Sequence, residues 1–236
     1  MSTYTNNIFT RYISQNNVNI IFELGSRDLI DGIQMLNYYR KTNKLYSFEC
    51  NPTCVEKCIA LYKTLSDTVK DKVDIVTKAV SLENGSISFM MVDENLMDNC
   101  GASSIYEIDF SNRIKSDPDR NRNPVQKKIT VDSIRLDTFC NNNNIKNIDL
   151  IAMDLQGYEL NALKSLGPLL QNVKYIITET CIQSTYKEGC NFKELYEFLS
   201  QNGFKYMVSD KYGNNIPPGN IKGWSEFNCL FKNSKM

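Results

Sequence analysis

The sequence predicts an α/β fold built on a mostly parallel β-sheet. Short runs rich in β-branched and aromatic residues alternate with amphipathic stretches along most of the chain. That alternation is typical of β-α-β units with right-handed crossovers. The chain has 236 residues, 42% of them hydrophobic, enough for one α/β domain with a substantial core. We therefore expect residues 1–236 to form a single domain, with its core over about residues 20–210.

Three strand–helix units are expected in the first part of the chain. IIFEL at 20–24 has the β-branched and aromatic content of a buried strand. Asp31 is a candidate cap for the helix that follows the first strand. Asn51 caps the next helix in this prediction, with Pro52 at its first position. The expected strands are 20–24, 44–50 and 73–80, and the expected helices are 31–41 and 52–65.

For the second part of the chain, the sequence predicts an irregular segment followed by regularly alternating strands and helices. Residues 93–128 are rich in Asn, Asp, Arg, Ser and Pro, so we expect a long loop of the kind that forms lids. Its Arg113, Arg120 and Arg122 would then meet an anionic part of a substrate, and a solvated loop is the equal alternative. The last two strands are expected to pair antiparallel at the C-terminal edge. The expected strands are 86–92, 129–136, 148–154, 173–179, 204–209 and 227–231, and the helices are 136–143, 158–165 and 191–202.

Composition excludes several classes of site and partner. The chain has no histidine, which removes Ser-His-Asp catalysis and the imidazole ligands of zinc. The formal net charge is zero, which argues against nucleic acid and anionic membrane as partners. We see no apolar run of about 20 residues and no apolar signal core, so we expect neither a membrane span nor secretion. We therefore expect the eight scattered cysteines to be reduced thiols of a cytoplasmic protein.

Polar residues end successive strands of the predicted sheet, where ligands collect in open α/β folds. Gly25 follows the first strand and would let the backbone approach a ligand. Glu49 lies 24 positions later, near the spacing at which an acid accepts the ribose hydroxyls of an adenosine cofactor. Asp154 ends a later strand. Each residue alone is more often a turn or a helix cap, but their order favours a site. A pyrophosphate-binding G-x-G-x-x-G loop is missing, which favours S-adenosylmethionine over a dinucleotide.

Five ordered segments resemble the FkbM family of S-adenosylmethionine-dependent methyltransferases. They are IFELGSRD (21–28), SFECNP (47–52), KAVSLENGSISF (78–89), GASSIY (101–106) and ITVDSIRLDTFCNNNNIKNIDLIAMDLQGYELNALKSLG (129–167). The resemblance implies a Rossmann-like class I methyltransferase fold. The family's first motif resembles D-x-G-A-N-x-G, from which this chain departs, and Gln156 stands where the family often has a glutamate.

The resemblance also implies cofactor roles for matched positions. Glu49 would hold the ribose with Asn51 beside it, and Ala79 and Val80 would line the adenine. Ser103 and Ser104 would approach from the middle region. Asp154 would lie at the reaction centre, with Gln156, Glu159 and Glu179 near it. The residues expected along the methionine part are Glu23, Gly25, Ser26, Arg27 and Asp28.

Without histidine, the proton of an acceptor hydroxyl must go to a carboxylate or be eased away by a metal. Asp154 is the first candidate and Glu179 the second, and the two are also the candidate ligands if Mg²⁺ takes part. The resemblance implies O-methylation of a sugar, nucleotide sugar, glycan or related small molecule. An RNA 2′-O-methyltransferase and a non-catalytic cofactor-binding or scaffold protein are the alternatives. The oligomeric state is open, and a homodimer is one option.

Overall fold

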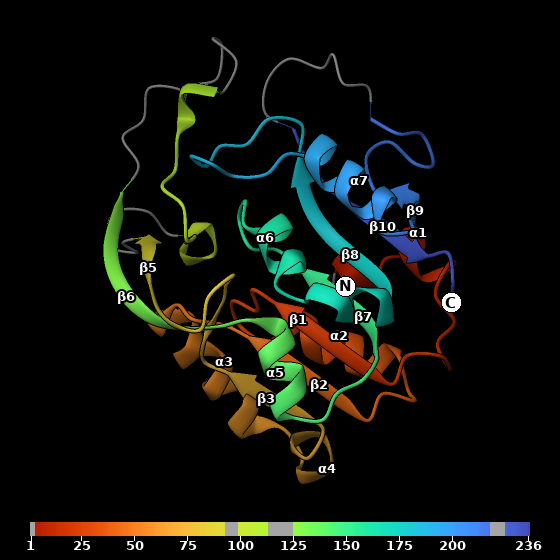
Figure 1. The fold of residues 1–236 in the computed structure, drawn as a ribbon. Helices are drawn as coiled ribbons and strands as arrows, with labels where there is room; N and C mark the ends of the chain where they lie inside the picture. Colours follow the sequence, from red (N-terminus) through yellow and green to blue (C-terminus); the bar gives the residue numbers. More distant parts are fainter. Residues whose placement is uncertain (1–2, 93–98, 113–124, 218–224) are drawn as a thin grey trace.

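A computed structural model describes residues 3–92, 99–112, 125–217 and 225–236. Its centre is a seven-stranded sheet in the order β3-β2-β1-β7-β8-β10-β9 (Figure 1). The strands are β1 (Ile20–Leu24), β2 (Lys44–Phe48), β3 (Val73–Val76), β7 (Ile148–Met153), β8 (Val173–Cys181), β9 (Phe204–Ser209) and β10 (Glu226–Asn233). The expected α/β fold with a mostly parallel sheet is confirmed.

Five neighbouring strands of this sheet run parallel. β1 pairs with β2 on one side and with β7 on the other, and β3 and β8 extend the parallel set outwards. β10 is antiparallel to both of its neighbours, β8 and β9. The predicted antiparallel pair at the C-terminal edge is therefore confirmed, and the carboxyl ends of β1, β2, β7 and β8 meet at one edge.

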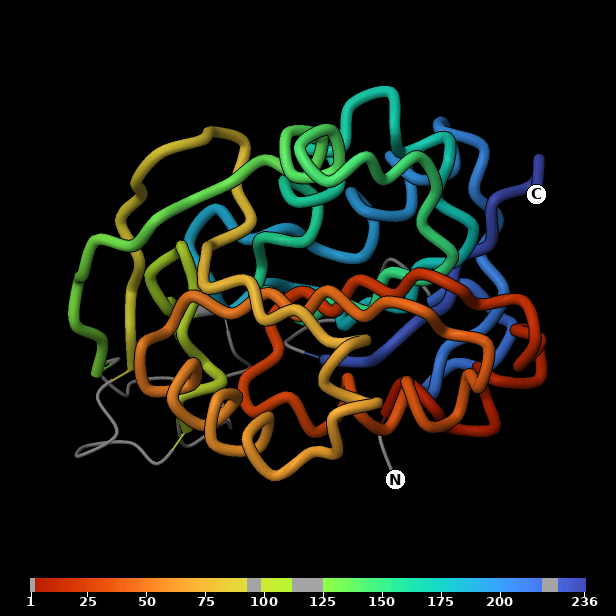
Figure 2. Tube along the Cα trace, turned by 90° about the horizontal axis from the view of Figure 1, so that it is seen from below, coloured from red at the N-terminus to blue at the C-terminus, as the bar shows by residue number. Residues whose placement is uncertain are grey.

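Helices cover both faces of the sheet because the strands are apolar on both faces. Along β1, Ile21 joins the core on one face, whereas Phe22 and Leu24 join the core on the other. The first core includes residues of α1, α2 and α3, and the second includes residues of α5, α6 and α7. Figure 2 shows α3 and α5 on opposite sides of the sheet. The helices are α1 (Asn7–Thr10), α2 (Ile30–Tyr38), α3 (Pro52–Thr64), α4 (Asp67–Lys70), α5 (Leu136–Asn142), α6 (Glu159–Lys164) and α7 (Phe192–Gln201).

A second, three-stranded sheet stands beside the first. The single strand expected over residues 73–80 is wrong, because this segment forms one strand in each sheet. The chain leaves the main sheet after Val76 and re-enters regular structure as β4 (Ala79–Val80). β4 pairs parallel with β6 (Gln126–Ile134), and β5 (Gly85–Val92) pairs antiparallel with the same strand. One apolar run therefore serves two sheets, because the hydrogen-bond partners of Ala79 and Val80 lie on β6 rather than on β2. The change of sheet turns Ala79 and Val80 towards the carboxyl edge.

The start of α2 also differs from the sequence prediction. The cap position is Leu29, at φ 68°, and not Asp31, which lies in the first turn of the helix. Asp28 supplies the local polar contact instead, because its Oδ1 accepts a hydrogen bond from the N–H of Ile30 at 3.1 Å. Asp31 is thereby free to face the carboxyl edge of the sheet.

The segment expected to be a long loop is partly regular where it is described. It contains the 3₁₀ helices η2 (Cys100–Ala102) and η3 (Phe110–Asn112), and β6 already begins at Gln126. The three arginines of the lid hypothesis, Arg113, Arg120 and Arg122, lie outside the described residues. Two further 3₁₀ helices are η1 (Thr3–Thr5) and η5 (Gly167–Asn172). No helix in the described part of the chain is long and apolar enough to cross a bilayer.

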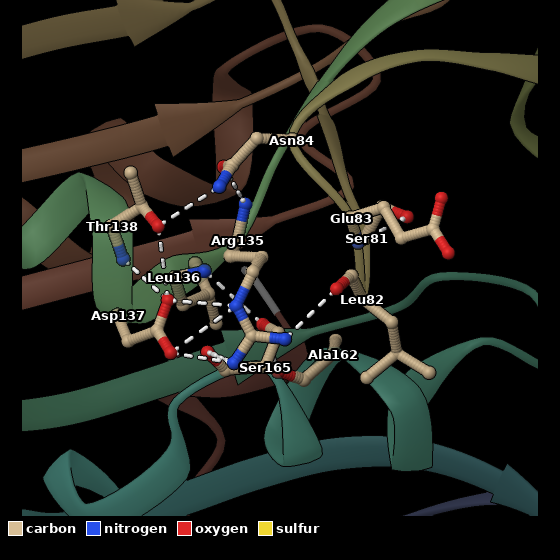
Figure 3. A network of polar contacts seen from close by, with 10 residues as sticks. All are labelled: Ser81, Leu82, Glu83, Asn84, Arg135, Leu136, Asp137, Thr138, Ala162 and Ser165. Carbon is tan, nitrogen blue, oxygen red and sulfur yellow. Dashed lines mark hydrogen bonds and ion pairs between the residues drawn. The ribbon is translucent and has the colours of Figure 1, made fainter.

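The segment IRLDTF joins the second sheet to the helices (Figure 3). Arg135 follows β6, and its guanidinium donates to both carboxylate oxygens of Asp137 and to the carbonyl of Leu82 at 2.8 Å. Ser165 at the end of α6 accepts a hydrogen bond from the N–H of Leu136 at 3.1 Å. A bidentate Arg–carboxylate pair fixes orientation as well as distance. This network holds the β4–β6–β5 sheet in one position against α5 and α6.

Candidate functional site

A cavity of about 540 Å³ opens at the carboxyl edge of the main sheet. Eleven of the residues for which the sequence predicts a place at the site line it: Gly25, Ser26, Arg27, Glu49, Asn51, Ala79, Val80, Ser103, Asp154, Gln156 and Glu179. Glu23, Asp28 and Ser104 do not belong to its wall. The structure therefore brings most of the expected residues together around one space large enough for a small-molecule ligand.

Gly25 lines the cavity and also permits the close contact between the ends of β1 and β7. Its φ is +83°, and a Cβ there would lie 2.0 Å from the carbonyl oxygen of Asp154. The N–H of Asp154 donates to the carbonyl of Leu24 at 3.0 Å. A glycine is needed because the backbones of these two neighbouring parallel strands are in contact where they end, and its expected contact with a ligand stays a prediction.

The two turns at this edge hold several residues in the left-handed region. Arg27, Leu29 and Gln156 have φ values of 59°, 68° and 53°. For residues other than glycine this conformation costs about 1–2 kcal/mol each, and such strain concentrates at functional sites. At Arg27 the bend turns the backbone N–H towards Glu49, whose Oε2 accepts it at 2.7 Å.

Glu23 lies beneath the first turn. Its Oε2 accepts hydrogen bonds from the hydroxyls of Ser26 at 2.7 Å and Ser47 at 2.6 Å. The carboxyl group is 2% exposed, and burial raises its pKa to about 7 against the opposing effect of the two hydroxyls. The side chain supports the turn and does not face the cavity, which differs from the position along the methionine part that we expected.

Glu49 is the acid at the end of β2. Its Oε1 accepts from the N–H groups of Cys50 at 2.9 Å and Asn51 at 2.8 Å. With the bond from Arg27, three of about four acceptor positions on the carboxylate are used, which leaves a position on Oε2 for a ligand. Burial raises the pKa of Glu49, and the three backbone donors oppose that effect.

Asn51 and the Ser103–Ser104 pair connect the segment 99–112 to the main sheet. Asn51 caps α3 and donates through Nδ2 to the hydroxyl of Ser103 at 3.1 Å. The hydroxyl of Ser104, which does not line the cavity, donates a hydrogen bond to the carbonyl of Gln156 at 2.8 Å. An apolar part of the cavity lies between these contacts and β4, lined by Phe48, Ala79, Val80, Phe89 and Leu155.

Asp154 and Glu179 form a hydrogen-bonded carboxyl pair at the ends of β7 and β8. Gln156 donates through Nε2 to Asp154 Oδ1 at 2.5 Å and to Glu179 Oε2 at 3.1 Å. Burial first, and then the charge of Asp154, raise the pKa of Glu179 to about 10. Burial also raises the pKa of Asp154, but its hydrogen bonds from Glu179 and Gln156 oppose that shift. At neutral pH, Glu179 is therefore the member of the pair that holds a proton.

Two further contacts fix this centre. The hydroxyl of Tyr186 donates to Gln156 Oε1 at 2.5 Å, which orients the amide so that its NH₂ faces the carboxyl pair. Glu159, at the start of α6, accepts from the N–H groups of Leu155 at 2.8 Å and Gly157 at 3.2 Å. Gln156 thus orients the two acids, and as an amide it cannot accept the proton itself.

Among the wall residues that sequence reasoning missed are Tyr4, Glu226 and Tyr186. Tyr4 comes from η1, far from every matched segment, and it is buried near Asp154, Glu23, Glu179 and Asp31, whose charges help to raise its pKa. Glu226 begins the antiparallel strand β10, so it shares an edge with Glu179 only after the chain has folded back. No local pattern in the sequence distinguishes these residues from ordinary surface positions.

The carboxyl pair does not fit a magnesium site. Its two acids are hydrogen-bonded to each other and to an amide NH₂, so their oxygens face donors rather than a cation. Across the described residues, no group of three or more Asp, Glu, Cys or His side chains is arranged to hold a metal ion. Cys54 and Cys58 are buried on α3, as expected of core thiols.

Comparisons with known proteins agree with this geometry. The family model described as the methyltransferase FkbM domain matches residues 30–206. The chain is 26% identical over 185 residues to the 2-O-methyltransferase NoeI of Sinorhizobium fredii, covering 76% of this chain and 70% of that protein.

Among solved structures, the methyltransferase FkbM from Methylobacillus flagellatus superposes with a TM-score of 0.57 at 10% identity, over 98% of this chain and 48% of that one. This chain thus spans about half the length of that structure. TrmK of M. capricolum, solved with S-adenosylhomocysteine, gives a TM-score of 0.51 at 13% identity, over 99% of this chain and 69% of that one. At these identities the structures show the fold, which is the Rossmann-like class I methyltransferase fold.

Proposed function

The chain belongs to the FkbM methyltransferase family, and on that premise we propose that it is an S-adenosylmethionine-dependent O-methyltransferase. The acceptor is a hydroxyl of a sugar, nucleotide sugar, glycan or related small molecule. One observation carries the proposal: the Asp154 carboxyl, held by Gln156 and Glu179, lies in the same cavity as the buried acid Glu49. The relative NoeI is named as a 2-O-methyltransferase, which favours an oxygen acceptor.

The residues of the cavity fit the cofactor. Glu49 keeps an acceptor position for a ribose hydroxyl, and the apolar part beside Val80 and Phe89 suits a flat aromatic base. Gly25, Ser26 and Arg27 follow the strand end at which the methionine part would lie. The cavity volume of about 540 Å³ is that of a pocket for a ligand of this size together with a small acceptor. Eight free thiols support the reducing cytoplasm as the place of action.

Methyl transfer to a hydroxyl requires that the two reactants are held in position and that one group accepts the hydroxyl proton. The bound cofactor supplies a sulfonium methyl group, which an oxygen nucleophile attacks in line with the departing sulfur. Asp154 receives the hydroxyl proton as the new C–O bond forms. Gln156 cannot act as a base, but it holds both carboxyl groups at fixed positions. Tyr186 locks the amide in that orientation, so the centre is organised before the substrate arrives.

Calorimetry with S-adenosylhomocysteine tests the cofactor, and transfer of a labelled methyl group to a panel of sugars and sugar nucleotides tests the reaction. We expect binding and methyl transfer by the wild-type protein. Asp154→Asn should bind S-adenosylhomocysteine but lose about 10²–10⁴-fold in rate, the usual contribution of a general base. Full activity of this variant would refute the assigned role.

A matched control separates loss of the base from general damage. Asp149→Asn changes an acid on the same strand, β7, that accepts backbone N–H groups of residues 19 and 20 at the opposite end from the cavity. We expect this variant to lose stability without a change in the rate of methyl transfer by the folded protein. Failure of the wild-type protein to bind S-adenosylhomocysteine would overturn the whole proposal. Methylation of RNA instead of sugars, with steep salt dependence of binding, would replace the acceptor class.

A further inference from the structure

Two loops pair beside the carboxyl pair and form part of the cavity wall. Ile108 and Tyr186 face each other in an antiparallel β-bridge, and the N–H of Asp109 donates to the carbonyl of Thr185 at 2.6 Å. The side chains of these loops that line the cavity form a surface that we call the loop wall. Its members are Ile105, Ile108, Phe110, Thr185 and Tyr186.

The second sheet holds the loop wall in place. The side chain of Gln126, at the start of β6, accepts a hydrogen bond from the N–H of Ile108 at 2.8 Å and donates to the carbonyl of Met90 on β5 at 3.3 Å. Val92 at the end of β5 packs with Ile108 and Tyr186 in an apolar cluster. A surface fixed in this way is organised before a ligand binds, which a specific binding site requires.

The loop wall adjoins the reaction centre rather than the residues expected to hold the ribose. Tyr186 bonds to Gln156, which donates to the carboxyl pair. The segment that carries the loop wall meets the ribose side only through Ser103, which accepts a hydrogen bond from Asn51. A group that lies against the loop wall is therefore next to Asp154, where a methyl acceptor must present its hydroxyl.

The loop wall offers a ligand mainly apolar contacts. Two isoleucines and Phe110 supply apolar surface, and Thr185 supplies a hydroxyl. Lys187 and Glu107 of the same two loops pair with each other at 2.5 Å, with more than half of each side chain exposed, and neither lines the cavity. An ionised group placed against this surface would lose its hydration without gaining a partner of opposite charge.

The cations that line the cavity within the described residues are Arg27 and Lys78. The guanidinium of Arg27 pairs with Asp28 at 3.0 Å. Lys78 stands directly before β4, next to Ala79, which we expect at the adenine. The reaction centre itself consists of two carboxyl groups. A phosphate on the acceptor would therefore meet acids and apolar side chains at this end of the cavity.

We propose that the loop wall is the acceptor subsite and that it selects an uncharged sugar over a sugar phosphate or a nucleotide sugar. The apolar C–H face of the sugar lies against Phe110 and Ile108, and a hydroxyl on its edge faces Asp154. Phe110 and Ile108 are thus specificity-determining residues that contact the acceptor and not the cofactor. The inference rests on the proposed function, because it takes the hydroxyl next to Asp154 as the methyl acceptor.

Matched acceptors test the charge preference. For each of several hexoses, the methyl glycoside, the sugar 1-phosphate and the uridine-diphosphate sugar are offered with labelled S-adenosylmethionine. We expect kcat/KM for the methyl glycoside to exceed that for the charged forms by about tenfold or more. Phe110 is half-buried, so Phe110→Arg can place a cation at the loop wall and should shift the preference towards the phosphate. Preference of the wild-type enzyme for a charged form would overturn the inference.

Truncation of the loop wall tests the contact itself. Phe110→Ala should raise the KM for the methyl glycoside roughly five- to twentyfold, the effect of losing part of an aromatic contact. The affinity for S-adenosylhomocysteine in calorimetry and kcat should stay unchanged. Phe198→Ala is the matched control, because Phe198 is a half-buried phenylalanine on α7 that does not line the cavity. It should lower stability and leave the acceptor KM as it is.

The outcomes separate this inference from the proposed function. An unchanged acceptor KM in Phe110→Ala, with active wild-type enzyme, overturns the subsite and leaves the methyltransferase standing. If the wild-type protein transfers no methyl group, the proposed function fails, and ligand-observed NMR with the methyl glycosides still decides the subsite. Saturation transfer that Phe110→Ala removes would support a neutral-sugar site, and no saturation transfer to any methyl glycoside would overturn it.

Discussion

Replacing Gly25 with alanine should damage the fold where the ends of the neighbouring strands β1 and β7 are in contact. A Cβ at this position would lie 2.0 Å from the carbonyl oxygen of Asp154, well inside van der Waals contact. The positive φ of +83° adds about 1–2 kcal/mol for a residue with a side chain. Moving the two strand ends apart would also weaken the hydrogen bond from the N–H of Asp154 to the carbonyl of Leu24, which contributes about 1 kcal/mol.

Adding strain for the displaced backbone, we expect Gly25→Ala to lower the free energy of unfolding by about 3–4 kcal/mol. For a chain of this size each kcal/mol shifts the melting temperature by about 2–4 °C, so the expected loss is about 6–16 °C. Thermal and urea unfolding measure it. Binding of S-adenosylhomocysteine should weaken as well, because the displaced atom belongs to the backbone of Asp154.

Gly213→Ala is the matched control. Its φ is +58°, and a Cβ there would have nothing within 4 Å, so only the conformational cost of about 1–2 kcal/mol should appear. The difference between the two variants isolates the contact with Asp154. Equal losses of stability in both variants would refute the reasoning that the contact between the ends of β1 and β7 requires glycine.

Three further predictions concern acids and a phenol at the same edge. Glu49→Gln should weaken S-adenosylhomocysteine binding by roughly 10- to 150-fold, equivalent to about 1.5–3 kcal/mol for charge-assisted hydrogen bonds, whereas exposed Glu56→Gln on α3 should bind normally in calorimetry. Burial raises the pKa of Glu23 to about 7, so its contribution to stability is complete below the ordinary value of 4.5 and is lost as pH rises to about 7. Urea unfolding should therefore show a smaller loss of stability between about pH 5 and 8 in Glu23→Gln than in wild type, and an identical loss would count against the buried acid. Tyr4→Phe should reduce kcat/KM about two- to tenfold, the effect of one hydrogen bond, and Tyr12→Phe, whose hydroxyl bonds Asn214 outside the cavity, should not.

The pattern of residues was enough to place much of the cavity wall. Glu49 and Asp154 were found because parallel strands end at one edge, so residues at strand ends become neighbours whatever the loops do. The same rule placed Glu179 beside Asp154. The rule does not say in which direction a side chain points. Glu23, Asp28 and Ser104 are therefore expected at the cavity from the sequence, although the structure places them outside its wall.

Other parts of the site depend on contacts between distant segments. Tyr4 reaches the cavity because Phe9, Ile13 and Val18 bury the N-terminal segment in the core on the α2 side. Tyr186 depends on the pairing of its loop with the segment around Ile108. Such contacts join residues that share no periodic pattern, so a single sequence carries no signal for them.

The sequence by itself determined the α/β class, the order of the main strands and the acids at their ends, because alternating apolar runs and strand-end polarity are local properties. Only the tertiary structure decided that the run 73–80 divides between two sheets, because the partners of these residues, on β2 and on β6, come from distant parts of the chain. It also decided that Gly25 lies against the backbone of Asp154 and that Glu179, crowded by Asp154 and Glu226, holds a proton. Burial and the proximity of like charges exist only once the chain is folded.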